Sequence, residues 1–310
     1  MKTLLLIDGN AIMHRAYHAL PPLRSREGLP TNAIYGFFSM LHRAVLDFKP
    51  HYIAVCFDTP AQTFRQKLLV EYQAQRPQAD AEFITQIPYI RDILEAAGIH
   101  RVEKDGFEAD DMIGTLTARF KNKVDKVLIL TGDKDIMQLV DRNVFVISPQ
   151  TGMSSITIYD EAAVEKKLSV KPGQIPDYKA FAGDPSDNYK GVKGIGPKTA
   201  VKLIEEFGSV ENLIKHLSSI KDEKLRTKLE EHKDSLLLTK KIATIVKDVD
   251  VGEKLETYAF HGFQNEMKVV FEKLQLNSML KRFFGTELPE PKKEPVKNVT
   301  DPEEPQPTLF

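Results

Sequence analysis

The sequence has a single cysteine, Cys56, among its 310 residues, which excludes an internal disulfide and any zinc site built on cysteines. It also lacks an apolar run near the roughly 20 residues that a membrane-spanning helix needs. The residues after Lys2 do not show the pattern of a signal peptide. We therefore expect a cytoplasmic protein that makes no contact with a membrane.

An excess of charge of one sign is missing too, because 43 Lys and Arg stand against 44 Asp and Glu. Such a balance can be the average of an acidic site and a basic surface. If the nine acids that we assign to one site below are set apart, bases outnumber acids in the rest of the chain. The composition therefore leaves room for a basic surface around an acidic pocket.

Four short apolar segments alternate with helical patterns in the first half of the chain. They are residues 3–7, 52–57, 126–130 and 144–148. This alternation is typical of an α/β fold whose parallel sheet is covered by helices on both faces. Helical periodicity is clear at 32–48 and 87–97. No Gly-x-Gly-x-x-Gly motif follows the first segment, which argues against a nucleotide-binding Rossmann protein.

Acidic residues gather where these predicted strands end and where one helix begins. Ligands of parallel sheets bind at the carboxyl ends of the strands. One aspartate there is usually a turn or cap residue, but several at one edge indicate a site. The acids at this edge are Asp8, Asp58, Glu108, Asp110, Asp111, Asp133 and Asp135. Asp184 and Asp187 follow in a segment that otherwise reads as a turn.

The chemistry of these side chains points to hard cations. No cluster of His or Cys accompanies the acids, and all-oxygen ligation favours Mg²⁺ or Mn²⁺. Nine carboxylates exceed one octahedral site, so we expect two ions or more. Two ions can stabilise the attacking and leaving oxygens when a phosphodiester is hydrolysed.

A glycine- and lysine-rich stretch between two helical patterns predicts a helix-hairpin-helix. Its glycines let the backbone approach a phosphate, and the following helix offers free N–H groups to an anion. An ordinary tight turn between helices is the alternative. The residues that we expect to contact DNA here are Lys190, Gly191, Lys193, Gly194, Gly196, Lys198 and Lys202.

The remaining segments complete the predicted organisation. A polar, weakly helical insertion occupies 60–88, Ile242 begins an expected strand or extended return that runs to 251, and a helical region spans 260–284. Proline-rich residues 286–310 are expected to be disordered. The predicted parts are a core at 1–168, a hairpin unit at 169–250, a helical segment at 251–285 and the tail at 286–310.

The motifs at 6–10, 57–58, 106–111, 131–135, 183–188 and 191–200 together resemble the 5′-3′ exonuclease domain of bacterial DNA polymerase I, in the flap endonuclease superfamily. The resemblance implies a PIN-like core, a helix-three-turn-helix DNA-binding domain and a monomer near the bacterial nucleoid. It also implies cutting of DNA at 5′ flaps, nicks and RNA-primer ends during replication and repair.

The resemblance also assigns roles to residues. All nine acids match metal ligands, and the outer ion of the family is held by Asp133, Asp135, Asp184 and Asp187. The hairpin is similar to one that holds K⁺ against DNA phosphates. Residues 60–88 look like the arch through which a free 5′ end passes, and Arg65, Tyr72 and Arg76 match substrate-contacting positions in it.

The chain departs from the family pattern in three places. Gln73 stands where a lysine near the scissile phosphate is usual, so we expect a slower enzyme that is still active. Tyr189 and Lys190 replace a usual Ile-Pro pair. No polymerase sequence follows, and the ending from Gln306 to Leu309 and Phe310 is similar to a peptide that binds the bacterial sliding clamp; the alternative is a chance ending.

Two other functions stay open at this stage. The chain could be a DNA-binding module whose catalysis is weakened, as Gln73 would suggest. It could also be a PIN-type ribonuclease, although those domains are usually shorter and lack the glycine- and lysine-rich hairpin. Cleavage of a flap substrate that depends on Mg²⁺ separates these functions from a 5′ nuclease.

Overall fold

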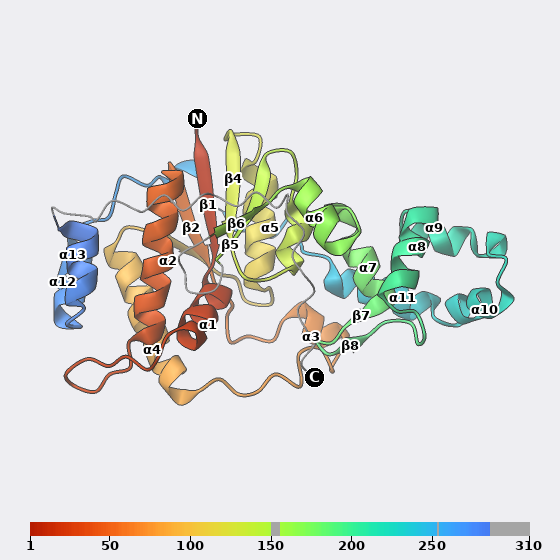
Figure 1. Ribbon diagram of the computed structural model, residues 1–310, viewed down its shortest axis with the longest axis horizontal. Helices are drawn as coiled ribbons and strands as arrows, with labels where there is room; N and C mark the ends of the chain where they lie inside the picture. Colours follow the sequence, from red (N-terminus) through yellow and green to blue (C-terminus); the bar gives the residue numbers. More distant parts are fainter. Residues whose placement is uncertain (150–155, 253, 286–310) are drawn as a thin grey trace.

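The computed structural model describes residues 1–149, 156–252 and 254–285. Its centre is a six-stranded sheet in the order β3-β2-β1-β4-β5-β6, in which β6 alone is antiparallel to its neighbour (Figure 1). The strands are β1 (Thr3–Asp8), β2 (Tyr52–Cys56), β3 (His100–Val102), β4 (Lys126–Leu130), β5 (Val144–Pro149) and β6 (Ile156–Tyr159). The predicted α/β class with a mostly parallel sheet is confirmed.

Helices cover both faces of this sheet because side chains alternate along each strand. Leu5 and Ile7 of β1 belong to one buried cluster, and Leu4 and Leu6 belong to another. The first cluster is closed by α1 (Gly9–Ala19), α2 (Asn32–Phe48), α4 (Ala81–Ala96), α12 (Glu266–Lys273) and α13 (Asn277–Phe284). The second is closed by α5 (Ala109–Phe120) and continues into the helical part of the chain.

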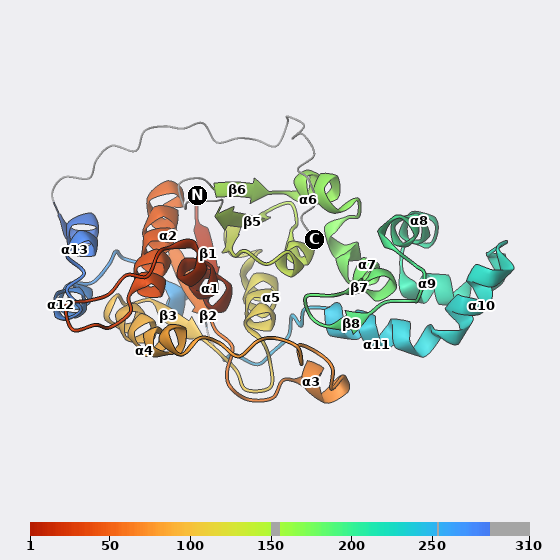
Figure 2. The ribbon, with the colours of Figure 1, turned by 60° about the horizontal axis from the view of Figure 1, so that its bottom comes forward.

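That helical part extends to one side of the sheet, as Figures 1 and 2 show. Its α-helices are α6 (Glu161–Leu168), α7 (Ile175–Ala182), α8 (Pro197–Phe207), α9 (Val210–Lys215), α10 (Glu223–Glu231) and α11 (Lys233–Ala243). A two-stranded hairpin, β7 (Gly183–Asp184) and β8 (Tyr189–Lys190), follows α7. Short 3-10 turns lie at η1 (Asp135–Leu139), η3 (Pro172–Gln174), η4 (Leu217–Ser219) and η5 (Leu255–Tyr258).

The chain returns from α11 to the core directly over α5. A Cβ on Gly114 of α5 would lie 2.5 Å from Cγ2 of Ile245 and 2.7 Å from the carbonyl oxygen of Val246, so only glycine admits this approach. The Gln138 side chain fixes the same stretch, because it donates to the Ala243 carbonyl and accepts from the Ile245 N–H. The two parts of the molecule therefore share one packed interface.

The structure corrects three details of the sequence analysis. Strands β3 and β6 were not predicted, and no strand forms in the described part of 242–251, where α11 ends at Ala243 and an irregular return follows. Within 60–88, a short helix α3 (Phe64–Leu68) forms, and α4 already begins at Ala81, because Asp80 caps it by accepting from the Glu82 N–H. Pro88 lies inside that helix.

Among the described residues, none of the helices has both the length and the apolarity to cross a membrane. The predicted tail at 286–310, with the clamp-like ending at Gln306, Leu309 and Phe310, lies outside the described residues.

Candidate active site

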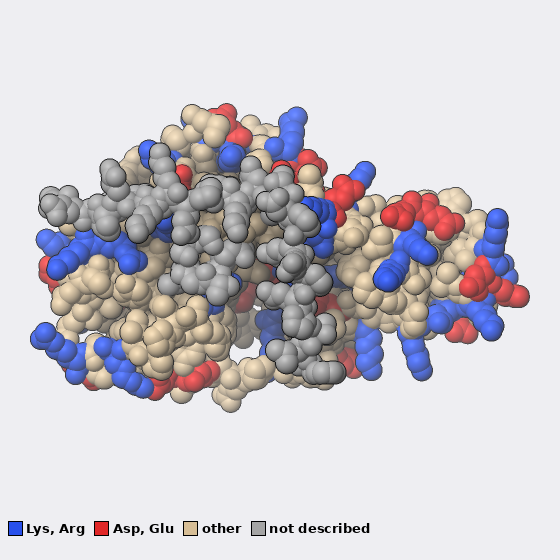
Figure 3. All heavy atoms as spheres, in the orientation of Figure 1, with Lys and Arg blue, Asp and Glu red and all other residues tan. Residues whose placement is uncertain are grey.

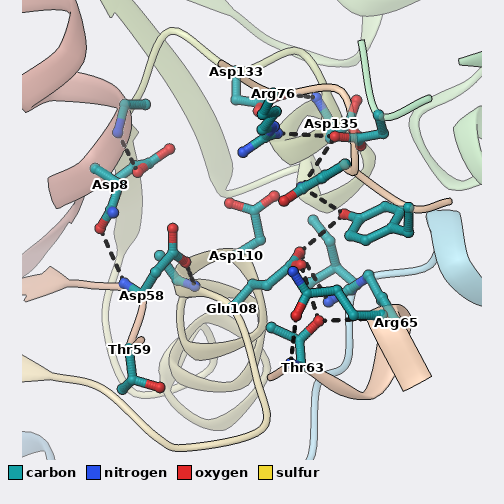
Figure 4. A pocket seen from close by; sticks show the side chains of 18 of the residues that line it. Asp8, Asp58, Thr59, Thr63, Arg65, Arg76, Glu108, Asp110, Asp133 and Asp135 are labelled. Atoms are coloured by element: carbon teal, nitrogen blue, oxygen red, sulfur yellow. Dashed lines mark hydrogen bonds and ion pairs between the residues drawn. The ribbon is translucent and has the colours of Figure 1, made fainter. Parts of the chain in front are cut away.

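A pocket opens at the carboxyl ends of the parallel strands, where the sheet meets α5 and the helical part (Figure 4). Seven of the nine predicted acids line it. They are Asp8, Asp58, Glu108, Asp110, Asp133, Asp135 and Asp187. Asp111 and Asp184 are not in the lining, and each has a different role in the surrounding structure.

Asp8 is the last residue of β1 and caps α1, since its Oδ1 accepts from the Ala11 N–H at 2.9 Å. The Thr131 hydroxyl donates to its Oδ2 at 2.8 Å. Burial raises the pKa of Asp8 to about 7, although both hydrogen bonds favour the ionised form. Within the described part of the chain, its hydrogen-bond partners include no cationic side chain, so none of them compensates its charge.

Asp58 lies just beyond β2 and faces the start of α5. Its Oδ1 accepts from the Ala109 N–H at 2.7 Å, and its own N–H donates to Oδ1 of Asn10 at 3.0 Å. The free N–H groups of a helix start favour a carboxylate there. Burial nevertheless raises the pKa of Asp58.

The acids that open α5 are crowded with those after β4. Burial, followed by the nearby charges of Asp133 and Asp8, raises the pKa of Asp110 well above its usual range. Burial also raises the pKa of Glu108 to about 7 and that of Asp135 to about 6. Several carboxylates in the pocket therefore hold protons near neutral pH unless cations replace them.

Asp111 lies outside the pocket in an ion pair with Arg65. The guanidinium donates from Nη1 and Nη2 to the two Asp111 carboxylate oxygens, each at 2.7 Å. The same oxygens accept from the N–H groups of Glu108 and Val246 at 3.0 and 2.9 Å. Both oxygens of this fully buried carboxylate are thus occupied, and Asp111 is placed to position other groups.

Arg65 and Tyr72, which the sequence suggested as substrate contacts, are buried as well. Besides Asp111, the Arg65 guanidinium bonds to the carbonyl oxygens of Ile242 and Thr244 at 2.8 and 3.1 Å. The Tyr72 hydroxyl donates to Oε2 of Glu108 at 3.1 Å. The structure therefore places these two side chains in the wall of the pocket, whereas Arg76 is exposed at its edge.

A second acidic group lies between η1 and the β7–β8 hairpin. One ligand atom from each of Asp135, Asp184 and Asp187 lies within 4.8 Å of the others, which fits a cation. Lys179 of α7, which the sequence analysis missed, donates to both Asp135 and Asp184. Burial alone would lower the pKa of Lys179, but the adjacent Asp135 carboxylate raises it above its ordinary value. Its position one helical turn before the turn-like 183–188 segment was the available signal.

The predicted hairpin lies between α7 and α8, with Lys190, Lys193, Lys198 and Lys202 exposed. Figure 3 shows Lys and Arg side chains projecting from the lower edge of this helical part. Gly196 precedes α8 with open space around it, and Gly194 has a positive φ of 84°. Gly191 instead serves packing, because a Cβ there would lie 2.2 Å from the Phe181 carbonyl oxygen.

Two family descriptions match the chain almost end to end. Residues 3–169 match "5'-3' exonuclease, N-terminal resolvase-like domain", and residues 170–266 match "5'-3' exonuclease, C-terminal SAM fold". The chain belongs to the 5′-3′ exonuclease family. This confirms the resemblance that the motifs indicated.

Individual relatives agree with this membership. A 5′-3′ exonuclease of Aquifex aeolicus is 40% identical over 282 residues, which are 91% of this chain and 95% of the relative. DNA polymerase I of Caldicellulosiruptor bescii is 42% identical over 288 residues, which are 92% of this chain and only 34% of the polymerase. The chain thus matches a free-standing exonuclease over nearly its full length and a polymerase over about a third.

Solved structures show the same fold at lower identity. T5 5′-exonuclease with bound zinc ions superposes with a TM-score of 0.65 at 22% identity, covering 89% of this chain and 99% of that protein. The catalytic core of Rad2 in complex with DNA superposes with a TM-score of 0.56 at 17% identity, covering 92% and 88%. These matches support a PIN-like core joined to a helical SAM-like part.

Proposed function

We propose that this family member is a structure-specific 5′-3′ exonuclease and 5′ flap endonuclease that hydrolyses phosphodiesters of flapped, nicked or RNA-primed DNA in replication and repair. The supporting observation is the convergence of seven carboxylates from three strand ends, one helix start and the β7–β8 hairpin on one open pocket. The sequence relation to a 5′-3′ exonuclease over 95% of that relative's length supports the same activity.

Divalent cations, which we propose to be Mg²⁺ or Mn²⁺, fit this donor set. The seven acids that line the pocket are hard oxygen donors, and repulsion among them is relieved by bound cations. Asp8, Asp58, Glu108 and Asp110 are assigned to one ion, and Asp133, Asp135, Asp184 and Asp187 to a second. When bound, such ions activate water and stabilise charge on a phosphodiester.

The other residues around the pocket orient these acids. Arg65 and Asp111 fix the start of α5, from which Glu108 and Asp110 project. Thr131 holds the Asp8 carboxylate, and Asn10 holds the backbone next to Asp58. Lys179 compensates the charge of the Asp135 and Asp184 pair when no cation is present. These contacts orient the Asp8 carboxylate and hold the backbone that carries Asp58, Glu108 and Asp110.

We assign DNA binding to the exposed lysines of the hairpin and to Arg76. Lysine charges grip phosphates without reading bases, which suits a nuclease that recognises DNA shape. Gly196 leaves the backbone just before α8 open, and K⁺ is the cation proposed there. We further propose that the enzyme works as a monomer and that its four parts are the core with its arch at 60–88, the hairpin unit, the 251–285 segment and the tail.

Cleavage of a DNA flap labelled at its 5′ end tests the activity. We expect cleavage with Mg²⁺, none with a chelator, and a loss of at least about 100-fold in Asp133→Ala. Lys273→Ala, on α12 at the far end of the molecule, is the control and should cleave like the wild type. Binding without cleavage would favour the DNA-binding module, and preference for structured RNA would favour the ribonuclease.

The clamp-like ending supports a second proposal, namely recruitment by a bacterial sliding clamp through Gln306, Leu309 and Phe310. A polar tether with an apolar end suits such capture. Pull-down by purified clamp should lose the chain when its last five residues are removed, while cleavage of a short flap should be unchanged. Equal capture of both forms would remove the proposal.

A further inference from the structure

A part of the predicted arch, residues 69–76, lies directly against the β7–β8 hairpin of the helical part. The Gln73 N–H donates to the Asp187 carbonyl oxygen at 2.9 Å, and Nδ2 of Asn188 donates to the Glu71 carbonyl oxygen at 2.7 Å. The 69–76 segment and the hairpin are more than 100 residues apart in the sequence. Their contact therefore joins two parts of the protein beside the pocket.

An apolar contact reinforces these backbone bonds. The rings of Tyr72 and Tyr189 stack with centroids 6.3 Å apart and an interplanar angle of 21°. Both rings are buried, and together with Ile242 and Ala243 they form a small core separate from the two main clusters. The contact between the 69–76 segment and the hairpin therefore brings the Tyr72 and Tyr189 rings together in this small core.

The polar side of the contact uses an acid that we assign to cation binding. Gln73 Nε2 donates to Asp187 Oδ1 at 3.1 Å and to the Tyr72 hydroxyl at 3.0 Å. Arg76 Nη2 donates to the same Asp187 oxygen at 2.9 Å. The 69–76 segment thus brings one cationic and one neutral donor to a carboxylate that also belongs to the Asp135, Asp184 and Asp187 group.

The backbone on both sides of the contact is in the left-handed region. Gln73 has φ of 56°, which a glutamine rarely adopts, whereas Asn188 has φ of 58°, which asparagine tolerates more readily. Such conformations persist only where surrounding contacts hold them. When those contacts are lost, the segment is free to leave.

We propose that Gln73 and Tyr189 are positioning residues that dock the 69–76 segment on the hairpin, and that this docking and cation binding at Asp187 oppose each other. The second half rests on the proposed function, because it requires that Asp187 hold a divalent cation. A cation beside Asp187 repels the Arg76 guanidinium and competes for the oxygen that Gln73 and Arg76 share. By reciprocity, a docked segment weakens cation binding by the factor with which the cation weakens docking.

Hydrogen–deuterium exchange of the full chain tests the docking first. In a chelator, Gln73→Ala and Tyr189→Ala should exchange the amides of 69–76 at least about 5-fold faster than the wild type. Two matched controls should exchange like the wild type. Gln75→Ala changes an exposed side chain in the same segment. Tyr189→Phe keeps the stacked ring while removing a buried hydroxyl that has no hydrogen-bond partner among residues 1–149, 156–252 and 254–285. Exchange in β1 reports whether each variant is folded.

Addition of Ca²⁺ tests whether docking of the 69–76 segment and cation binding at Asp187 oppose each other. We expect Ca²⁺ to speed exchange of 69–76 in the wild type toward the rate of Gln73→Ala, and calorimetry to show about 3- to 10-fold tighter Ca²⁺ binding by that variant. A structural role alone would change stability without changing cation affinity.

Each result supports or overturns the proposal. Unchanged exchange in Gln73→Ala and in folded Tyr189→Ala would overturn the docking role, and unchanged Ca²⁺ affinity in Gln73→Ala would overturn the opposition. Neither measurement contains DNA, so failure of the nuclease assay leaves the docking arm intact. A wild type that binds no Ca²⁺ or Mg²⁺ would overturn both the cation assignment and the opposition, but not the docking.

Discussion

Asp8 and Asp111 are both buried aspartates near the start of a helix, yet their surroundings differ. Among the residues that the structure describes, Asp8 accepts hydrogen bonds only from neutral groups, and burial raises its pKa to about 7. Asp111 is paired with the Arg65 guanidinium through two bonds of 2.7 Å. A buried charge that lacks a cationic partner opposes folding, whereas removing one member of a buried pair is costly. Replacing each aspartate by asparagine should therefore change the free energy of unfolding in opposite directions.

We expect Asp8→Asn to stabilise the cation-free protein at pH 8 by on the order of 1–3 kcal/mol, because asparagine caps a helix without a charge. Flap cleavage should fall by at least about 100-fold. Asp111→Asn should destabilise the protein by about 3–5 kcal/mol, because the buried Arg65 guanidinium loses its shortest ion pair and keeps only the one with Glu108 at 3.1 Å. Thermal unfolding in a chelator measures both, and a lower melting temperature for Asp8→Asn would contradict the cation assignment.

Gln73 offers a second comparison at this scale. A lysine there would bring a positive charge to the pocket edge, where a neutral amide cannot stabilise charge developing on a phosphate. We expect Gln73→Lys to raise the single-turnover rate of flap cleavage by about 10-fold. Gln75→Lys controls for added charge in the same exposed segment and should leave the rate near that of the wild type. An unchanged rate in Gln73→Lys would show that this position does not limit catalysis.

Sequence reasoning found the acids but could not separate their roles. Asp110 and Asp111 are adjacent, and a helix start turns successive side chains about 100° apart, so that only one faces the pocket. The partner of Asp111, Arg65, is 46 positions away in the chain. No local pattern indicates that pair, or the bond of Lys179 to Asp135, which is 44 positions away.

At the scale of elements, the long and periodic segments were predicted best. Helix α2 begins and ends at the expected residues, 32 and 48, because its apolar residues recur with helical spacing. Strand β3 has only three residues and was missed, because its pattern is too short to recognise. The start of α4 was missed because Pro88 suggested a boundary near 87, whereas the Asp80 cap starts the helix six residues earlier, at Ala81.

The glycine- and lysine-rich hairpin before α8 leads to a prediction about DNA binding. Lys193→Ala and Lys198→Ala should each weaken binding of flapped DNA and reduce the slope of log affinity against log salt by about 1, because each removes one phosphate contact. Fluorescence anisotropy across a salt series, with Ca²⁺ in place of Mg²⁺ to prevent cleavage, measures the slope. Lys273→Ala on α12 is the matched control, and an equal effect in that variant would count against a specific grip.

At the scale of the whole molecule, the acidic pocket makes stability depend on pH and cations. The pKa of Asp8 is raised from 3.8 to about 7 and that of Glu108 from 4.5 to about 7. Between these values the folded state holds protons that the unfolded state has lost, so stability falls as pH rises from about 4.5 to about 7. The stability that protonated Asp8 and Glu108 contribute is fully present only below their ordinary pKa values.

We therefore expect the melting temperature of the chelated protein to fall between pH 5 and pH 8. Mg²⁺ or Ca²⁺ should reverse the fall, because cations replace the protons and bind only the folded state. Differential scanning fluorimetry across this range measures both effects. In Asp8→Asn the fall should be smaller, and a melting temperature that rises with pH in the chelated wild type would contradict the assignment.

The buried hydrogen bonds of Arg65 and Asp111 have one more consequence. Its guanidinium bonds to Ile242 and Thr244, and its partner Asp111 bonds to Val246. The pocket wall is thus completed by residues that lie 177 and 179 positions after Arg65 in the chain. A chain that carries all nine acids but lacks residues 242–246 would leave the Arg65 and Asp111 pair without the backbone groups that hold it.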